Sequence, residues 1–151
     1  MPDIRKEETI HASIAEVWDV WNDFGAIAVW HPGLRKSALM DQSPATGMGA
    51  KRRCDFADGK HYILEEIVDY QAGKSLTVHI YDGNIPVQTS KVTFTLDALG
   101  PDTTRLSAEV DFKLKGGVLG SIAKPLAKKQ LGNDISKLLR ANKTYVERSA
   151  I

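Results

Sequence analysis

A chain of 151 residues is the size of one domain and can bury roughly 68–70% of its unfolded surface. Its hydrophobic and charged fractions, 42% and 26%, are ordinary for a globular protein and argue against intrinsic disorder. The formal net charge is +1. The basic clusters are short, Lys51-Arg52-Arg53 and the lysines at positions 124, 128 and 129, and we interpret them as solvated faces. We therefore expect neither a nucleic-acid partner nor a membrane-surface partner.

The cysteine content and the apolar stretches restrict the compartment and the class of protein. Cys54 is the one cysteine, which rules out an internal disulfide and a cysteine metal site. No apolar stretch approaches the ~20 residues that cross a bilayer, and the first eight residues do not resemble a signal peptide. We expect a single domain spanning residues 1–151, cytoplasmic, without membrane insertion, metal or cofactor, and monomeric or homodimeric.

The N-terminal part combines one strand with short helices. Ile4 to Ala12 is predicted as the first strand. Ser13 and Glu16 then form a capping box, in which the serine hydroxyl accepts from the Glu16 N–H. Phe24-Gly25 ends the helix, and a second short helix is expected before Trp30. The helical stripe consists of Ile14, Val17, Trp18 and Trp21.

A run of strands separated by turn residues follows. Asp58-Gly59 is a strong hairpin signal. The alternation of apolar Val92 and Phe94 with polar Lys91 and Thr93 indicates an antiparallel sheet with one solvated face. The predicted strands are Leu34–Met40, Ala50–Phe56, Lys60–Tyr70, Leu76–Tyr81, Val87–Leu99 and Thr103–Leu114.

The C-terminal part is predicted as one long helix that reaches about Arg148. Pro125 and Gly132 are positions where it could kink or start late. The order of elements predicts an α+β fold in which about seven antiparallel strands curl around this helix and enclose a volume, to be filled by side chains or by a ligand. The buried stripe of the helix is predicted as Leu131, Ile135, Leu138, Leu139, Asn142, Tyr145 and Val146.

Arg52 is the most informative polar residue, because it alternates with Ala50 and Cys54 on the apolar face of its strand. A charge in a dry core is costly unless it is paired, so an inward Arg52 implies a partner carboxylate, with Glu65 the obvious candidate, or a wet cavity. The alternative is an Arg52 that faces solvent and pairs with Glu66. Periodicity alone does not decide which face of the 60–70 strand is buried and, if anything, favours burying the face of Tyr62, Leu64, Glu66, Val68 and Tyr70.

Five short motifs carry a resemblance to a known family: Ala15-Glu16-Val17-Trp18, Trp30-His31-Pro32, Gly49-Ala50-Lys51-Arg52, Glu65-Glu66-Ile67 and Asp82-Gly83-Asn84-Ile85-Pro86-Val87. Together they resemble the helix-grip superfamily, which includes START lipid-transfer domains, plant hormone receptors and pathogenesis-related allergens, and bacterial polyketide cyclase/dehydrase-like proteins. The chain is most similar to the last branch. The resemblance implies that the carboxylate of Glu65 faces the cavity, together with His61, Ile63 and Ile67; Glu66 stands where the family often has arginine.

The expected function is binding of a small hydrophobic ligand, lipid-like or polyketide-like, by a carrier or sensor. The first alternative is a cyclase or dehydratase with Glu65 or His61 as general base and Arg52 as the partner of an enolate-like oxygen. The second is a co-chaperone-like interaction module. The expected ligand-binding residues are Trp30, His31, Arg52, Cys54, His61, Ile63, Glu65, Val78, Ile80, Ser90, Val92, Phe94, Ile135, Leu138 and Asn142.

Three of these residues have competing interpretations. Trp30 is expected nearest the pocket mouth, whereas Trp18 is expected in the core. His31 either gates the pocket or caps a turn. Asn142 lies on the apolar stripe of the long helix and needs a partner, which is a ligand, a sheet side chain or a buried water. The four histidines lie on separate elements without paired ligand spacing, so we expect no metal site.

Overall fold

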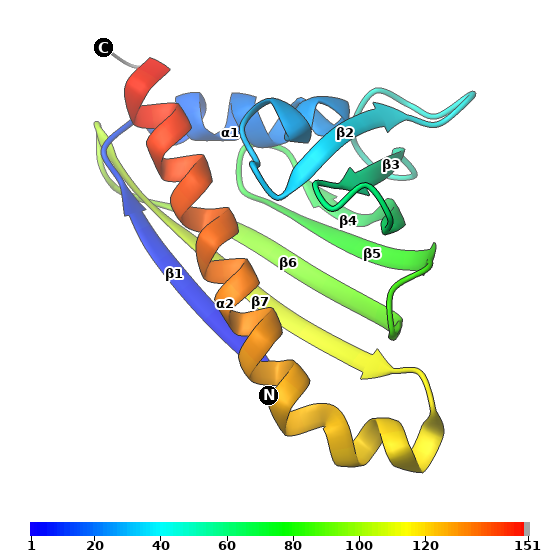
Figure 1. The fold of residues 1–151 in the computed structure, drawn as a ribbon. Coiled ribbons are helices and arrows are strands. Elements are labelled where there is room, and N and C mark those ends of the chain that lie inside the picture. The colour runs from blue at the N-terminus through cyan, green and yellow to red at the C-terminus, as the bar shows by residue number, and fades with distance from the viewer. Residues whose placement is uncertain (150–151) are drawn as a thin grey trace.

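The computed structural model describes residues 1–149, so Ala150 and Ile151, the end of the expected domain, lie outside the described residues. Figure 1 shows a curved sheet with the long C-terminal helix lying along its concave side. The elements are β1 (Ile4–Ile10), α1 (Ile14–Asn22), the 3₁₀ helix η1 (Phe24–Val29), β2 (Leu34–Leu39), β3 (Lys51–Phe56), β4 (Tyr62–Gln71), β5 (Ser75–Gly83), β6 (Val87–Gly100), β7 (Thr103–Leu114) and α2 (Gly117–Ser149).

The seven strands form one antiparallel sheet in the order β1-β7-β6-β5-β4-β3-β2. Strands β2 to β6 each pair with the next strand along the chain, and β7 also pairs with β1, where Ile4 lies opposite Val110. The predicted fold class is confirmed. Strands with one apolar and one polar face can build such a sheet because only the concave face needs cover.

Helix α2 provides that cover. Its buried residues include Ile135, Leu138, Leu139 and Val146, which recur at the spacing of one helical face. The helix begins at Gly117 and continues through Pro125 and Gly132, so of the two alternatives, a kink or a late start, the late start does not occur. Glycines at positions 116 and 117 have φ angles of 99° and 56°, which residues with a Cβ adopt at a cost, and they turn the chain from β7 into α2.

The hairpin between β3 and β4 shows why one predicted boundary moved. The prediction started β4 at Lys60, whereas the strand starts at Tyr62. The carboxylate of Asp58 accepts hydrogen bonds from the backbone N–H groups of Lys60 (2.7 Å) and His61 (3.0 Å). This Asx-type turn uses both donors, so the ladder begins after it.

The volume between the sheet and the helices is filled at the end where α1 crosses. The rings of Trp21 and Phe94 lie with their centroids 4.3 Å apart, and Trp30 packs edge-on against Trp21 at 5.2 Å. Trp18 is buried there too, as predicted for a core residue. Aromatic side chains of this size fill the space between α1 and the sheet.

Candidate functional site

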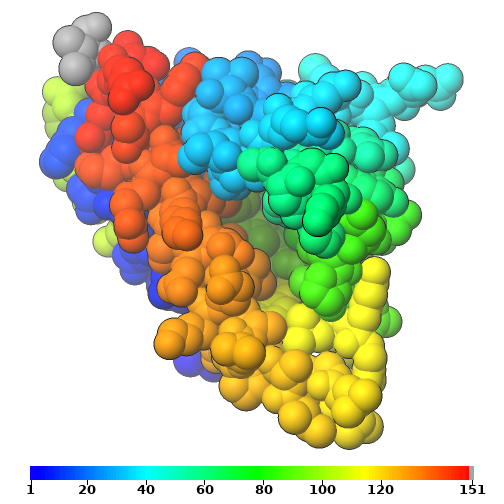
Figure 2. Space-filling model, in the orientation of Figure 1, coloured from blue at the N-terminus to red at the C-terminus, as the bar shows by residue number. Residues whose placement is uncertain are grey.

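A cavity of about 460 Å³ lies between the concave face of the sheet and α2. Figure 2 shows the molecular surface hollowed between the orange part of α2 and the green strands. Most of its wall is apolar: Ile63 from β4, Val78 from β5, Val92 from β6 and Leu138 from α2 all contribute. The inward positions of each strand alternate with outward ones, so neighbouring strands bring these side chains to one surface.

Within the apolar wall lies a buried ion pair between neighbouring strands. Arg52 of β3 and Glu65 of β4 are direct partners in the antiparallel register. The Nε of Arg52 donates to Oε1 of Glu65 at 2.8 Å, and the two residues are only 5% and 8% exposed. The alternative pairing with Glu66 is wrong, because Glu66 lies opposite Lys51.

The guanidinium of Arg52 is held from three sides. Its Nη1 donates to the backbone carbonyl of Phe24 at 2.9 Å, and its Cζ lies 3.9 Å above the centroid of the Phe24 ring. These contacts and the ion pair with Glu65 compensate a charge that would be costly in a dry core. The Arg52 side chain is therefore positioned by two contacts with Phe24 of η1 and by its ion pair with Glu65 of β4.

Cys54 lies beside the ion pair, and its thiol has low reactivity. Its thiol donates to Oε1 of Glu65 at 3.4 Å. Burial, and then the neighbouring carboxylate of Glu65, raise the pKa of the Cys54 thiol far above its usual range. The residue is thus a neutral thiol, which is a poor nucleophile. This agrees with its interpretation as a small apolar strand residue.

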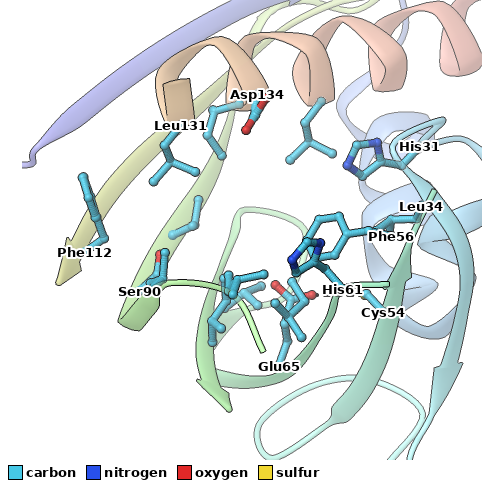
Figure 3. A pocket seen from close by; sticks show the side chains of 18 of the residues that line it. His31, Leu34, Cys54, Phe56, His61, Glu65, Ser90, Phe112, Leu131 and Asp134 are labelled. Carbon is cyan, nitrogen blue, oxygen red and sulfur yellow. Dashed lines mark hydrogen bonds between the residues drawn. The ribbon is translucent and has the colours of Figure 1, made fainter. Parts of the chain in front are cut away.

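The ion pair keeps hydrogen-bonding capacity toward the cavity. Nη2 of Arg52 and Oε2 of Glu65 make no hydrogen bond within residues 1–149. Both atoms remain accessible, since neither is a fully buried polar atom that lacks a partner. Figure 3 shows the carboxylate of Glu65 directed into the space bounded by the labelled side chains. At the ion pair, the cavity thus offers a donor group and an acceptor group side by side, next to the apolar residues of the wall.

Two histidines lie at the margin of this cavity. His31 accepts from the N–H of Gly33 at 3.2 Å through Nδ1, so it caps a turn and lines the cavity at once. Burial, and then the positive charge of Arg52, lower the pKa of His31 below its usual value. His61 is half exposed at the rim, where its Nδ1 lies 2.5 Å from Oδ2 of Asp58; this contact lowers the pKa of Asp58 far below its usual range.

Two of the expected ligand-binding residues are elsewhere. Trp30 does not line the cavity, because it packs against Trp21 on the filled side of the molecule. Asn142 does not line it either: its Oδ1 accepts from Nε1 of Trp21 at 3.1 Å within the core. The other expected residues lie in the cavity wall: His31, Arg52, Cys54, His61, Ile63, Glu65, Val78, Ile80, Ser90, Val92, Phe94, Ile135 and Leu138.

Sequence reasoning missed several wall residues. Phe56 and Phe112 stand on inward strand positions, so the alternation used for their neighbours could have found them. Ile85 and Pro86 lie in the loop between β5 and β6, where periodicity gives no signal. Further lining residues that were not expected are Ile27, Leu34, Asp58, Val87, Leu114, Ala127, Gln130, Leu131 and Asp134.

Two other kinds of feature, a metal site and a membrane span, are not found in the described part of the chain. Among residues 1–149, no group of three or more His, Cys, Asp or Glu side chains is placed to hold a metal ion. In the same part of the chain, no helix combines the length and the apolar character that crossing a bilayer requires.

Solved structures with the same fold cover nearly the whole chain. A START superfamily protein from Mycobacterium smegmatis has a TM-score of 0.80 at 21% identity and covers 96% of this chain and 97% of that one. The Zhui aromatase/cyclase from a Streptomyces species has a TM-score of 0.83 at 15% identity and covers 98% of this chain and 94% of that one. Norcoclaurine synthase from Thalictrum flavum, in complex with dopamine and hydroxybenzaldehyde, has a TM-score of 0.71 at 18% identity and covers 95% of this chain and 84% of that one.

These structural likenesses, at identities of 15–21%, show the fold alone. No curated protein matches the chain significantly. The sequence itself, however, matches a family model over residues 1–147, nearly its full length. The chain therefore belongs to the family described as polyketide cyclase / dehydrase and lipid transport.

Proposed function

We propose that this protein binds a small, largely apolar molecule in the cavity, as a carrier or sensor. The observation that carries this proposal is an apolar cavity of about 460 Å³ whose wall contains one buried, partly unsatisfied ion pair. Small-molecule sites typically have volumes of about 300–1,000 Å³ and a few polar groups in an apolar wall. The cavity fits this description in size and in composition.

The ion pair indicates which polar group the ligand carries. Arg52 and Glu65 together have no net charge, so an ionised ligand group would gain from one partner and be repelled by the other. A neutral carbonyl or hydroxyl can accept from Nη2 of Arg52, and a hydroxyl can also donate to Oε2 of Glu65. We therefore expect a neutral ligand with one oxygen function at this point and an apolar body against Ile63, Val78 and Leu138.

The comparisons support a ligand of this general class. The family description names both polyketide cyclases or dehydrases and lipid transport, and both activities handle molecules that are mainly apolar and carry oxygen groups. The norcoclaurine synthase structure was determined with dopamine and hydroxybenzaldehyde. These relatives support a site for an organic molecule and leave its identity to experiment.

Catalysis by Glu65 or His61 is the alternative, and the geometry favours binding over it. Oε1 of Glu65 accepts hydrogen bonds from both Arg52 and Cys54, so one of the two carboxylate oxygens is already occupied within the protein. His61 lies at the rim and is tied to Asp58. An enzyme would lose turnover but retain ligand binding in Glu65→Gln, because the amide preserves shape but removes the base.

The proposal is tested with N-phenylnaphthylamine, a neutral apolar dye that becomes fluorescent in apolar sites. Ser90 is buried in the cavity wall, whereas Lys91, the next residue of β6, is exposed on the outer face. Ser90→Phe should fill part of the cavity and weaken dye binding at least about tenfold, an affinity change of about 1.4 kcal/mol. Lys91→Phe, the matched control, should bind the dye like the wild type.

Circular dichroism establishes whether both variants are folded before their dye titrations are compared. Equal dye binding by wild type, Ser90→Phe and Lys91→Phe would contradict the proposed cavity site. Native mass spectrometry of the gently purified protein, beside a denatured and solvent-extracted sample, would then identify any molecule that co-purifies.

A further inference from the structure

The start of α2 carries an exposed apolar stripe that the cavity does not explain. Val118, Leu119, Ile122 and Leu126 have exposed fractions of 78%, 76%, 72% and 76%. Their spacing of three and four residues places them on one face of the helix. Single exposed apolar residues are common, but four on one helical face are typical of an interaction surface.

The charges around this stripe have one sign. Residues 112–133 contain five lysines and no aspartate or glutamate, although the whole chain has 20 basic and 19 acidic residues. Lys124 pairs with Asp3. Within residues 1–149 the other four make no ion pair, and they are exposed: Lys113, Lys115, Lys128 and Lys129. An apolar stripe flanked by unpaired lysines has the composition of a helix that lies on an anionic surface.

The position of this segment in the molecule favours a flat partner. Figure 1 shows the first turns of α2 projecting beyond the sheet, at the end of the molecule where β7 runs into the helix. The four side chains of the stripe, each more than 70% exposed, therefore lie on a protruding part of the molecule. Its neighbour Ala127, on the inner side of the same helix, lines the cavity together with Leu131.

We propose that residues 117–129 dock on the surface of a membrane that contains anionic lipids. The side chains of Val118, Leu119, Ile122 and Leu126 enter the interface between headgroups and acyl chains, and the lysines contact the lipid phosphates. The helix lies in the plane of the interface, because it does not have the apolar length to cross the bilayer. This replaces the interpretation of the lysines at 124, 128 and 129 as simply solvated.

Charge argues against the other occupants of this surface. A second copy of the chain would bring the same unpaired lysines together, and like charges at an interface are unfavourable. An acidic protein surface would satisfy the lysines but would leave four apolar side chains, each more than 70% exposed, against charged groups. A lipid surface is negatively charged, apolar just below its headgroups, and deformable enough to meet a protruding helix.

Vesicle co-sedimentation tests the proposal with the full-length chain. Vesicles of phosphatidylcholine alone are compared with vesicles that also contain phosphatidylserine, at low and at high salt. The wild type should bind the phosphatidylserine vesicles, and high salt should weaken this binding because it screens the lysines. Lys128→Gln with Lys129→Gln should weaken it about fivefold per lysine, whereas Lys36→Gln with Lys91→Gln, two exposed lysines elsewhere, should not.

The apolar stripe is tested separately. Ile122→Ser with Leu126→Ser should weaken vesicle binding at least about tenfold, and because both side chains are more than 70% exposed, thermal unfolding should stay unchanged. Val29→Ser with Leu99→Ser removes two apolar residues exposed at other places (69% and 51%) and should bind like the wild type.

Several results would overturn the proposal. These are no binding to either vesicle, equal binding to both vesicle types, unchanged binding by the Ile122/Leu126 variant, or self-association of the wild type that this variant abolishes. The test does not depend on the cavity ligand, because the same variant should bind N-phenylnaphthylamine normally without vesicles. A failure of membrane docking and a failure of the cavity site are therefore distinguishable.

Discussion

The space between the sheet and the helices is solid at one end and hollow at the other. Where α1 crosses, Trp21 and Phe94 stack and Asn142 bonds to Trp21, so large side chains fill the volume. Beside the middle of α2, where residues 127–138 line the cavity, the wall combines apolar side chains with the small Ser90 and the paired Arg52 and Glu65, and a volume stays open. One sheet and one helix thus supply both a core and a site.

Two neighbouring leucines on α2 test this contrast with the largest expected effect. Leu139 is 1% exposed and does not line the cavity, whereas Leu138 lines it. Leu139→Ala should lower the free energy of unfolding by about 4 kcal/mol, because it opens a new void in a packed core. Leu138→Ala should lower the free energy of unfolding by about 2 kcal/mol. At this position the protein loses the favourable burial of the leucine side chain, but no new void opens, because the cavity is already there. Urea unfolding measures both.

The two leucine variants should also differ in ligand binding. Leu138→Ala should change the affinity for N-phenylnaphthylamine and Leu139→Ala should not. Equal losses of stability, with equal effects on dye binding, would show that the two regions do not differ as described.

Removal of one partner from the ion pair is the next largest expected effect. Glu65→Leu leaves Arg52 buried without its carboxylate and should lower the free energy of unfolding by about 3 kcal/mol, the low end for buried pairs, because the cavity offers some solvation. Arg52→Met combined with Glu65→Leu should recover most of this loss. A double variant as unstable as the sum of the single variants would mean that the two charges are not coupled.

Cys54 should react slowly although it lines the cavity. Burial and the carboxylate of Glu65 raise the pKa of its thiol, so little thiolate is present at neutral or mildly alkaline pH. Alkylation by iodoacetamide, followed by mass spectrometry, should be at least about 100-fold slower than in the urea-unfolded protein. A rate close to that of the unfolded chain would contradict both the burial and the raised pKa.

His31 should give the smallest effect, visible as a pH dependence of stability. Its pKa is lowered in the folded state from the model-compound value of 6.5, so below that pH the unfolded chain binds more protons. The contribution of His31 is therefore complete above about 6.5 and is lost as the pH falls toward the folded-state pKa. His31→Gln should show a shallower decline in the free energy of unfolding over this window than the wild type; an identical pH profile would contradict the lowered pKa.

The sequence predicts the sheet and much of its inner face, because alternation in β3, β6 and β7 marks which residues point inward. It placed Arg52 inward on this basis, and a family resemblance was needed to choose the face of Glu65. The sequence did not show that Trp30 and Asn142 contact Trp21 and not the cavity. Periodicity indicates that a residue is buried but does not identify the residues that it contacts. The hairpin turn at Asp58-Gly59 was predicted, but the start of β4 was not, because it depends on side-chain to backbone hydrogen bonds of Asp58. The loop at Ile85 lies outside any period, so its place in the cavity wall escaped prediction.

The most direct test of the cavity as the ligand site is a methyl NMR titration of isoleucine-, leucine- and valine-labelled protein with N-phenylnaphthylamine. The account predicts the largest shift changes at Ile63, Val78 and Leu138, which line the cavity, with small changes at Leu139 in the packed core. Shift changes confined to the exposed stripe of α2, at Val118, Leu119, Ile122 and Leu126, would contradict it.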